Sequence, residues 1–162
     1  MTDLASADAG IRQLQSRYID AVWRRDYAAF ADCFAKDGEW LIAGHVYRGP
    51  DECVACLKSF MPRFDRVKMT MGSPILNVGD GVATGRTEVL EHNILADRTR
   101  HITIGTYFDR FVEQGDRWRF AWHFYQLYYL GPPDMSGDFY EIADYGPPPA
   151  MPDADAPTVM LS

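Results

Sequence analysis

The sequence predicts an α+β domain in which three N-terminal helices cover one face of a curved antiparallel sheet. Three observations support this prediction. Apolar residues recur at three- and four-residue steps near the start of the chain, and long segments rich in aromatic residues follow up to about residue 130. Short polar turns join these segments, and such turns favour antiparallel pairing. Helices followed by a run of strands are typical of the α+β class.

The helices are predicted from apolar periodicity and from capping residues. The first two span 7–26 and 27–35, and Ser6 can cap the first of them. The apolar stripe of the first helix consists of Ile11, Leu14, Tyr18 and Val22. A third helix begins near Pro50, a residue that suits the first turn of a helix, and runs to about Phe60.

The strands are predicted from long alternating segments between polar turns. The first, Glu39–Tyr47, lies between the second and third helices. The others follow the third helix and are Arg66–Val78, Val82–Asp97, Arg100–Val112 and Arg117–Tyr129. Together these elements form the body of the protein.

Composition divides the chain into a domain over residues 1–130 and an acidic, proline-rich tail over residues 131–162. The tail carries six acidic residues, no Lys or Arg, and seven of the ten prolines. Most of it reads as an extended segment. Aromatic and aliphatic residues at 139, 140, 142 and 145 would be unusual in a fully solvated segment, so we expect residues 134–146 to pack on the body.

Charge and hydropathy exclude several classes of function. The net charge is −7, and because the tail holds most of it, the body is close to neutral. An acidic protein of this kind is a poor partner for nucleic acid or for an anionic membrane. The sequence has no run of 18 apolar residues and no basic, apolar leader at its start. We therefore expect a cytoplasmic protein that does not bind membranes.

The cysteines do not form a metal-binding pattern. Cys53 and Cys56 have the spacing of a metal-ligand pair, but no second cysteine pair or histidine cluster completes a zinc site. The pair falls in the third predicted helix, where this spacing places both residues on one face. With Cys33, they are expected to be reduced core thiols. No metal site is predicted.

Titratable residues gather on one face of the predicted sheet. If the last three strands alternate sides with a period of two, that face collects Glu91, His101, Tyr107, His123 and Tyr125. A carboxylate, two imidazoles and two phenols are groups that transfer protons. Their position within apolar strands predicts a buried reaction chamber.

Several local sequences resemble a known family, in the same order and with the same spacing over residues 8–130. They are Ile11–Arg25, Asp26–Phe30, Phe34–Trp40, Tyr47–Glu52, Gly105–Tyr107 and Gly115–Phe120. These segments are similar to the SnoaL-like domain of the NTF2-like superfamily. The resemblance implies a cone in which a strongly curved sheet wraps around helices and encloses a deep apolar cavity.

The family also implies a range of activities. It includes scytalone dehydratase, hexachlorocyclohexane dehydrochlorinase, bile acid 7α-dehydratase, ketosteroid isomerase, polyketide cyclases and a diarylpropane lyase that releases formaldehyde. Most members use general acid–base catalysis without a metal or organic cofactor, so none is expected here. Members commonly form homo-dimers or homo-trimers. The apolar residues Trp118, Phe120, Trp122 and Phe124 on the last strand predict a covered surface of that kind.

The chain departs from the family at its usual catalytic pair. The dehydratase and dehydrochlorinase members combine a helix Asp with a strand His, and the corresponding positions here are Trp23 and Thr70. Glu91 instead corresponds to a functional Asp of bile acid dehydratase, and Tyr18 to a helix tyrosine that binds substrate or a catalytic water. The resemblance therefore implies a replacement set of catalytic groups.

On this basis the predicted catalytic residues are His123, His101, Glu91 and Tyr18. The predicted substrate-binding residues are Trp23, Trp40, Thr70, Tyr107 and Tyr125. The predicted function is a cofactor-independent lyase that dehydrates a small aromatic or alicyclic hydroxylated compound, or deformylates a lignin-derived diarylpropane. The alternatives are an isomerase or cyclase, a hydrophobic-ligand binding protein, and a dioxygenase small subunit.

Structural roles remain open for the three central residues. His123 could be a hydrogen-bonded core residue, and His101 could lie on the surface near the start of its strand. Glu91 could face solvent or pair with Arg86 or Arg100, because burying an unpaired carboxylate is unfavourable.

Overall fold

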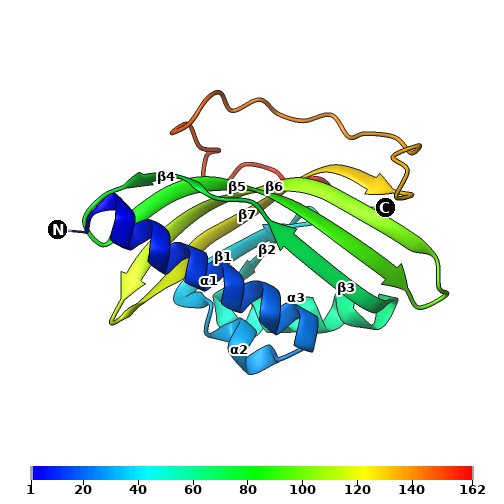
Figure 1. Ribbon diagram of the computed structural model, residues 1–162, viewed down its shortest axis with the longest axis horizontal. Helices are drawn as coiled ribbons and strands as arrows, with labels where there is room; N and C mark the ends of the chain where they lie inside the picture. Colours follow the sequence, from blue (N-terminus) through cyan, green and yellow to red (C-terminus); the bar gives the residue numbers. More distant parts are fainter. Residues whose placement is uncertain (1, 162) are drawn as a thin grey trace.

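A curved sheet and the helices that lie against its concave side make up the body of the protein (Figure 1). The computed structural model describes residues 2–161. In chain order the elements are α1 (Leu4–Arg24), α2 (Tyr27–Ala31), β1 (Phe34–Ile42), β2 (His45–Arg48), α3 (Gly49–Phe60), the 3₁₀ turn η1 (Met61–Arg63), β3 (Phe64–Met71), β4 (Ile75–Val78), β5 (Val82–Leu95), β6 (Arg100–Gln114) and β7 (Arg117–Gly131). The predicted α+β class and the NTF2-like arrangement are confirmed.

The sheet is mixed and unclosed. Its strand order is β2-β1-β7-β6-β5-β3. β4 pairs with the first part of β5, and β3 pairs with the second part of the same strand. All the pairs are antiparallel except β1 with β7, which run parallel. The expectation of a purely antiparallel sheet was wrong here. No hairpin turn links β1 to β7, because the rest of the sheet and α3 separate them in sequence, so turn geometry does not fix their relative direction.

Several element boundaries differ from those predicted. Asp3, and not Ser6, caps α1, since its Oδ1 accepts a hydrogen bond from the Ser6 N–H at 3.0 Å. Ala43 and Gly44 both have positive φ, at 53° and 78°, so the chain turns sharply there and the predicted strand Glu39–Tyr47 is a hairpin of β1 and β2. The predicted strand 66–78 likewise divides into β3 and β4.

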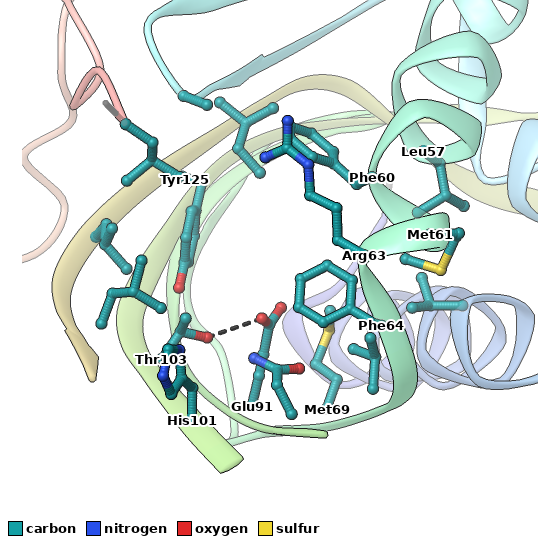
Figure 2. Close-up of a pocket in the computed structure, with 18 of the residues that line it drawn as sticks. Leu57, Phe60, Met61, Arg63, Phe64, Met69, Glu91, His101, Thr103 and Tyr125 are labelled. Carbon is teal, nitrogen blue, oxygen red and sulfur yellow. Dashed lines mark hydrogen bonds between the residues drawn. The ribbon is translucent and has the colours of Figure 1, made fainter. Parts of the chain in front are cut away.

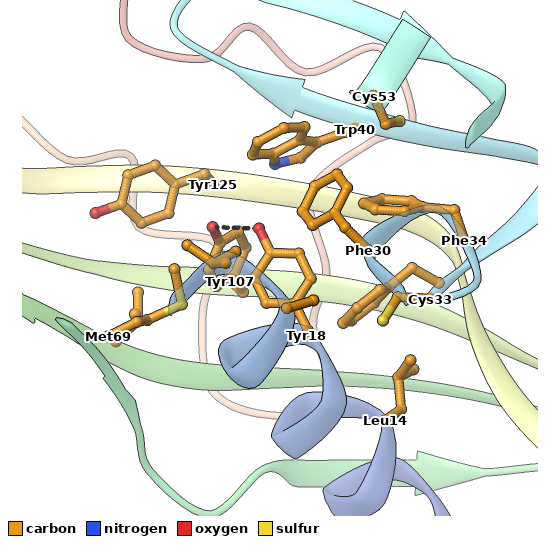
Figure 3. Packing of buried hydrophobic residues seen from close by; sticks show 14 of the residues in the cluster. Leu14, Tyr18, Phe30, Cys33, Phe34, Trp40, Cys53, Met69, Tyr107 and Tyr125 are labelled. Atoms are coloured by element: carbon orange, nitrogen blue, oxygen red, sulfur yellow. Dashed lines mark hydrogen bonds between the residues drawn. The ribbon is translucent and has the colours of Figure 1, made fainter. Parts of the chain in front are cut away.

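The core forms where α1 packs against the inner face of the sheet (Figure 3). The predicted stripe of α1 is buried, and its contacts include aromatic residues from α2, β1 and β7. Packing is close enough to require glycine at position 10, because a Cβ there would lie 2.4 Å from Cδ1 of Trp118. Each fully buried large apolar side chain contributes about 1.5–3 kcal/mol to folding.

A bulge in β7 divides the aromatic face that the sequence predicted on this strand. The register shifts by one residue at Ala121, between the pairs of Arg110 and Phe111. Trp118 and Phe120 consequently point into the main core, whereas Trp122 and Phe124 form a second cluster with Leu41 and Phe108. Four residues predicted to share one surface therefore lie on two faces.

The C-terminal tail crosses the convex face of the sheet, over this second cluster (Figure 1). Tyr145, Met151 and Ala156 pack against the cluster. Side chains from the sheet donate hydrogen bonds to the tail: Arg86 to the carbonyls of Gly146 and Ala150, Arg110 to Pro152, Trp122 to Ala154, and Gln126 to Ala143, at 2.6–3.1 Å. The chain itself thus covers the apolar surface that was expected to lie against a partner.

The cysteines are buried, free thiols. Burial raises the pKa of Cys53 to about 12 and that of Cys56 to about 11, so both remain protonated at neutral pH. Within residues 2–161, no group of three or more His, Cys, Asp or Glu side chains is arranged to hold a metal ion. Over the same residues, none of the helices combines the length and apolar character needed to cross a membrane.

Candidate active site

A cavity of about 330 Å³ lies between the inner face of the sheet and the segment formed by α3 and η1 (Figure 2). Most of its wall is aliphatic or aromatic and comes from α1, β1, α3, β3 and β7. The volume is at the lower end of the range for small-molecule sites, and apolar walls with few polar groups are typical of such sites. The cavity is therefore the candidate active site.

A small set of polar side chains interrupts the apolar wall. Besides Thr158 of the tail, its members are Tyr18, Arg63, Glu91, Asn93, His101, Thr103, Tyr107 and Tyr125. Five of the predicted site residues are in this set, and Trp40 also lines the cavity. The Trp40 Nε1–H is buried and has no hydrogen-bond partner among the described residues. The polar groups of this set come from five parts of the chain that the fold brings together: α1, η1, and the strands β5, β6 and β7.

Glu91 is the carboxylate of the cavity. It lies directly opposite Thr103 in the β5–β6 ladder, and the Thr103 hydroxyl donates a hydrogen bond to Glu91 Oε2 at 2.7 Å (Figure 2). Burial raises the pKa of Glu91, and hydrogen bonds from Thr103 and Asn93 oppose that shift. No ion pair to Glu91 occurs within residues 2–161, and Arg86 binds the tail instead. Glu91 is thus an oriented, unpaired carboxyl group that can exchange a proton.

Three phenols lie near this carboxyl group. The hydroxyls of Tyr18 and Tyr107 are hydrogen-bonded at 3.3 Å, and either can be the donor (Figure 3). Tyr125 is the cross-strand neighbour of Tyr107, and their ring centroids are 4.9 Å apart. The Tyr125 hydroxyl makes no hydrogen bond of good geometry to any described residue, although Thr103 is close. Burial raises the pKa of all three phenols, so they are neutral; Tyr125 and one hydroxyl of the Tyr18–Tyr107 pair remain available as hydrogen-bond donors.

His123 lies behind the cavity wall and does not line the cavity. Its imidazole is fully buried and stacks on the Tyr107 ring, with centroids 3.9 Å apart and planes 10° from parallel. His123 Nδ1 is 2.5 Å from Asp109 Oδ1, and these residues are direct cross-strand partners. Burial raises the pKa of Asp109, and His123 opposes that shift. His123 therefore stacks behind Tyr107 and does not line the cavity, so the geometry gives no support to its predicted direct proton transfer.

Two predicted wall residues also lie outside the cavity. Trp23 is 47% exposed and lies under the Lys68 ammonium, which is 5.3 Å from the centroid of a Trp23 ring. Thr70 is exposed on β3, while its neighbour Met69 is buried and lines the cavity. Thr70, which the resemblance placed at the site, therefore points away from the cavity, because successive side chains of a strand lie on opposite faces.

Residues 3–122, most of the chain, match the SnoaL-like domain. The protein belongs to the SnoaL-like family. Among curated proteins, no sequence match to the chain was found.

Solved structures share the fold of this SnoaL-like protein. A hexachlorocyclohexane dehydrochlorinase (LinA) of type 2 is 17% identical, with 90% of this chain and 96% of that one covered and a TM-score of 0.72. A putative scytalone dehydratase from Novosphingobium aromaticivorans is 18% identical, with coverage of 80% and 94% and a TM-score of 0.71. A protein of unknown function from Mycobacterium tuberculosis is 26% identical, with 74% of each chain covered and a TM-score of 0.68.

Sequence reasoning missed four groups of this SnoaL-like site. Asn93 lies two residues after Glu91, and Thr103 two residues after His101, so each pair shares a face of its strand. The alternation that predicted Glu91 and His101 could therefore also have predicted Asn93 and Thr103. Asp109 follows Tyr107 on the same face and was detectable by the same rule. Arg63 had no such signal, because it belongs to the short turn η1 that joins α3 to β3.

The end of the tail completes the wall of the cavity. Thr158, Val159 and Leu161 line it, and the Thr158 hydroxyl accepts a hydrogen bond from the Gly44 N–H at 3.0 Å. Met160 packs against Gly44, where a Cβ would lie 2.4 Å from the Met160 Cγ. The tail passes over the convex side of the sheet (Figure 1). Its last residues then reach the cavity near the β1–β2 turn.

Proposed function

We propose that this protein is a lyase that removes water, or a related leaving group, from a small hydroxylated aromatic or alicyclic compound. It does so by general acid–base chemistry of its own side chains in the cavity. The observation that carries this proposal is Glu91, a carboxyl group with a raised pKa, held by Thr103 in an otherwise apolar site. A half-buried carboxyl group whose pKa is raised by desolvation is a candidate for general acid–base catalysis.

The proposed elimination begins when the Glu91 carboxylate takes a proton from a substrate carbon. The electron pair of that C–H bond forms a carbon–carbon double bond, and the C–O bond on the neighbouring carbon breaks. The departing oxygen takes a proton from His101, the cavity imidazole, and leaves as water. Glu91 then returns its proton to solvent and His101 is reprotonated, so the protein ends each cycle unchanged.

The phenols hold the substrate in place. The Tyr125 hydroxyl has no hydrogen-bond partner in the described chain and donates to a substrate oxygen, which stabilises the negative charge that develops there. The Tyr18–Tyr107 pair provides a second donor at the same side of the cavity. His123 supports this pair from behind, through its stacking contact with Tyr107. The predicted role of His123 thus becomes positioning.

Relatives with eliminating activities support the proposal. The names of two structural neighbours describe a dehydrochlorinase and a dehydratase. A phenolic substrate would let the electrons pass through a quinone methide, which makes deformylation of a lignin-type diarylpropane a variant of the same chemistry. An isomerase or cyclase would use the same groups without a leaving group, and product analysis distinguishes these reactions.

Two non-catalytic alternatives are less favoured. A carrier for hydrophobic ligands needs apolar walls but gains nothing from a half-buried, unpaired carboxyl group in them. One neighbour is the beta subunit of a putative aromatic-ring-hydroxylating dioxygenase, 13% identical with a TM-score of 0.67. A subunit of that kind would use an open sheet face for assembly, and here the tail covers that face.

The test is a substrate screen with a matched pair of variants. Purified protein is incubated with aromatic and alicyclic alcohols and with lignin-type diarylpropanes, and products are followed by mass spectrometry and by formaldehyde release. Glu91→Gln should lower kcat on any active compound by at least 100-fold, the scale of a lost general base. Glu88→Gln, on the exposed side of β5, is the control. The proposal fails if nothing turns over or if Glu91→Gln keeps wild-type activity.

The expected homo-dimer or homo-trimer remains part of the proposal. Because the tail covers Trp122 and Phe124, the contact surface between subunits must lie elsewhere. Light scattering on the purified protein measures the assembly directly, and a monodisperse monomer would remove this expectation.

A further inference from the structure

Arg63 is a cation at the cavity without a partner carboxylate. It is the one Arg or Lys among the residues that line the cavity, and within residues 2–161 no acid lies at ion-pair distance from it. The nearest acid in sequence, Asp65, pairs with Arg66 and Arg98 instead. The guanidinium is therefore free to bind a group from outside the chain.

Arg63 is also held so that it faces this space. Its backbone carbonyl accepts a hydrogen bond from the Ala96 N–H at 2.9 Å, which ties η1 to the β5–β6 turn. Its guanidinium carbon lies 5.6 Å from the centroid of the Phe60 ring, another residue of the cavity wall. Figure 2 shows the side chain extending from η1 across the opening between Phe60 and Phe64. An arginine stacked on an aromatic ring keeps its donors available for a carboxylate.

The two charged groups of the cavity fix a direction for an anionic ligand. Glu91 projects from β5 and Arg63 from η1, on different sides of the cavity (Figure 2). A ligand carboxylate next to Glu91 would be repelled once Glu91 ionises, whereas next to Arg63 it would be attracted. The aromatic and aliphatic wall between them accepts a ring.

We propose that Arg63 selects ring compounds that carry a carboxylate, and that it orients them with the carboxylate at the opening and the hydroxylated carbon toward Glu91. This inference rests on the proposed function for the identity of the reacting end. The recognition of the carboxylate itself does not require turnover. Because the body of the protein is close to neutral, the single positive charge of Arg63 favours the approach of an anion to the cavity.

Equilibrium binding tests this selection independently of any reaction. The probes are para-hydroxycinnamate and its primary amide, which has nearly the same shape and no charge, with calorimetry as the readout at pH 7.5. Wild-type protein should bind the acid about tenfold more tightly than the amide. Arg63→Gln should remove this preference while leaving binding of the amide unchanged, and Arg63→Lys should restore part of it. Arg66→Gln, on the neighbouring strand and outside this cavity, should behave as wild type.

The coupling between the two charges gives a second readout. A carboxylate bound in the cavity should favour protonation of Glu91, so binding of the acid should take up protons, and Glu91→Gln should abolish that uptake. The proposal is overturned if the acid fails to bind, if wild type does not prefer it to the amide, or if Arg63→Gln retains the preference. Because binding is measured without catalysis, a protein that binds the acid but transforms nothing refutes the lyase and leaves the role of Arg63 standing.

Discussion

The ionised side chain of Glu91, which the proposed reaction uses, should lower the stability of the folded protein. Folding raises the pKa of this carboxyl group above its ordinary value of 4.5, so the folded state holds the proton more tightly than the unfolded chain does. The stability contributed by that proton is complete below about pH 4.5 and is lost as the pH rises through the folded pKa. At pH 8 the protein holds a charged group in an apolar cavity. Replacing Glu91 by Gln should remove this unfavourable charge.

The magnitude follows from two opposing contributions at Glu91. An ion in a protein interior carries a desolvation penalty of several kcal/mol. The Thr103 hydrogen bond, at 2.7 Å, returns about 1.5–3 kcal/mol when its acceptor is charged and about 1 kcal/mol when it is neutral. Because Gln retains a carbonyl acceptor for Thr103, the substitution should stabilise the fold by on the order of 2 kcal/mol at pH 8. For a domain of this size that is a rise in Tm of about 4–8 °C.

Thermal unfolding of wild type, Glu91→Gln and the control Glu88→Gln at pH 4 and pH 8 measures the effect. The gain should be present at pH 8 and close to zero at pH 4, where Glu91 is protonated and resembles Gln. Glu88→Gln should change Tm little at either pH, because residue 88 is exposed. An equal gain at both pH values, or a loss of stability at pH 8, would refute the assignment of Glu91 as a desolvated, unpaired carboxyl group.

Three further predictions concern other parts of the site. Asp109→Ala should destabilise the fold by about 3–5 kcal/mol, read from the urea midpoint, because it leaves His123 buried without its partner; Asp109→Leu combined with His123→Leu should lose less than the two single changes together. Tyr125→Phe should lower kcat by about 10-fold or more on any substrate found while Tm stays within about 2 °C of wild type, since the Tyr125 hydroxyl has no partner within the described chain; a large fall in Tm would contradict this. Removing the chain from Pro157 onward should open the cavity, so that diarylpropane-sized ligands bind at least as well as single-ring ones in calorimetry; an unchanged size preference would count against a wall formed by the tail.

The sequence predicted the fold and the centre of the site because both depend on local alternation. Glu91, His101 and Tyr107 were placed on one face by counting along continuous strands, and the β5–β6 ladder keeps that count without a break. The helices and their apolar stripe depend on periodicity of the same local kind. Such patterns survive in a single sequence because each element must bury one face.

The predictions failed where an irregularity interrupts the alternation of side chains along a strand. They also failed where residues distant in the sequence pack against each other. Thr70 was placed by the resemblance, whereas the structure turns Met69 inward on β3, after a register shift between Phe64 and Arg66. On β7, the bulge at Ala121 turns Trp118 and Phe120 into the main core and away from the face of Trp122. The stacking of His123 behind Tyr107 depends on side-chain packing between strands, which alternation does not describe.

The hydrogen bonds from the sheet that hold the tail in place do not depend on which side chains the tail carries at the bonded positions. Arg86, Arg110, Trp122 and Gln126 all bind main-chain carbonyls of the tail, which any amino acid offers. Tail side chains other than those that pack on the second cluster or on Gly44 can therefore change without releasing the tail from the sheet. Val159 and Leu161, which line the cavity, are the positions where such changes would alter its shape. Natural variation in ligand preference should accordingly accumulate in the last few residues, while the strands that carry Glu91 stay as they are.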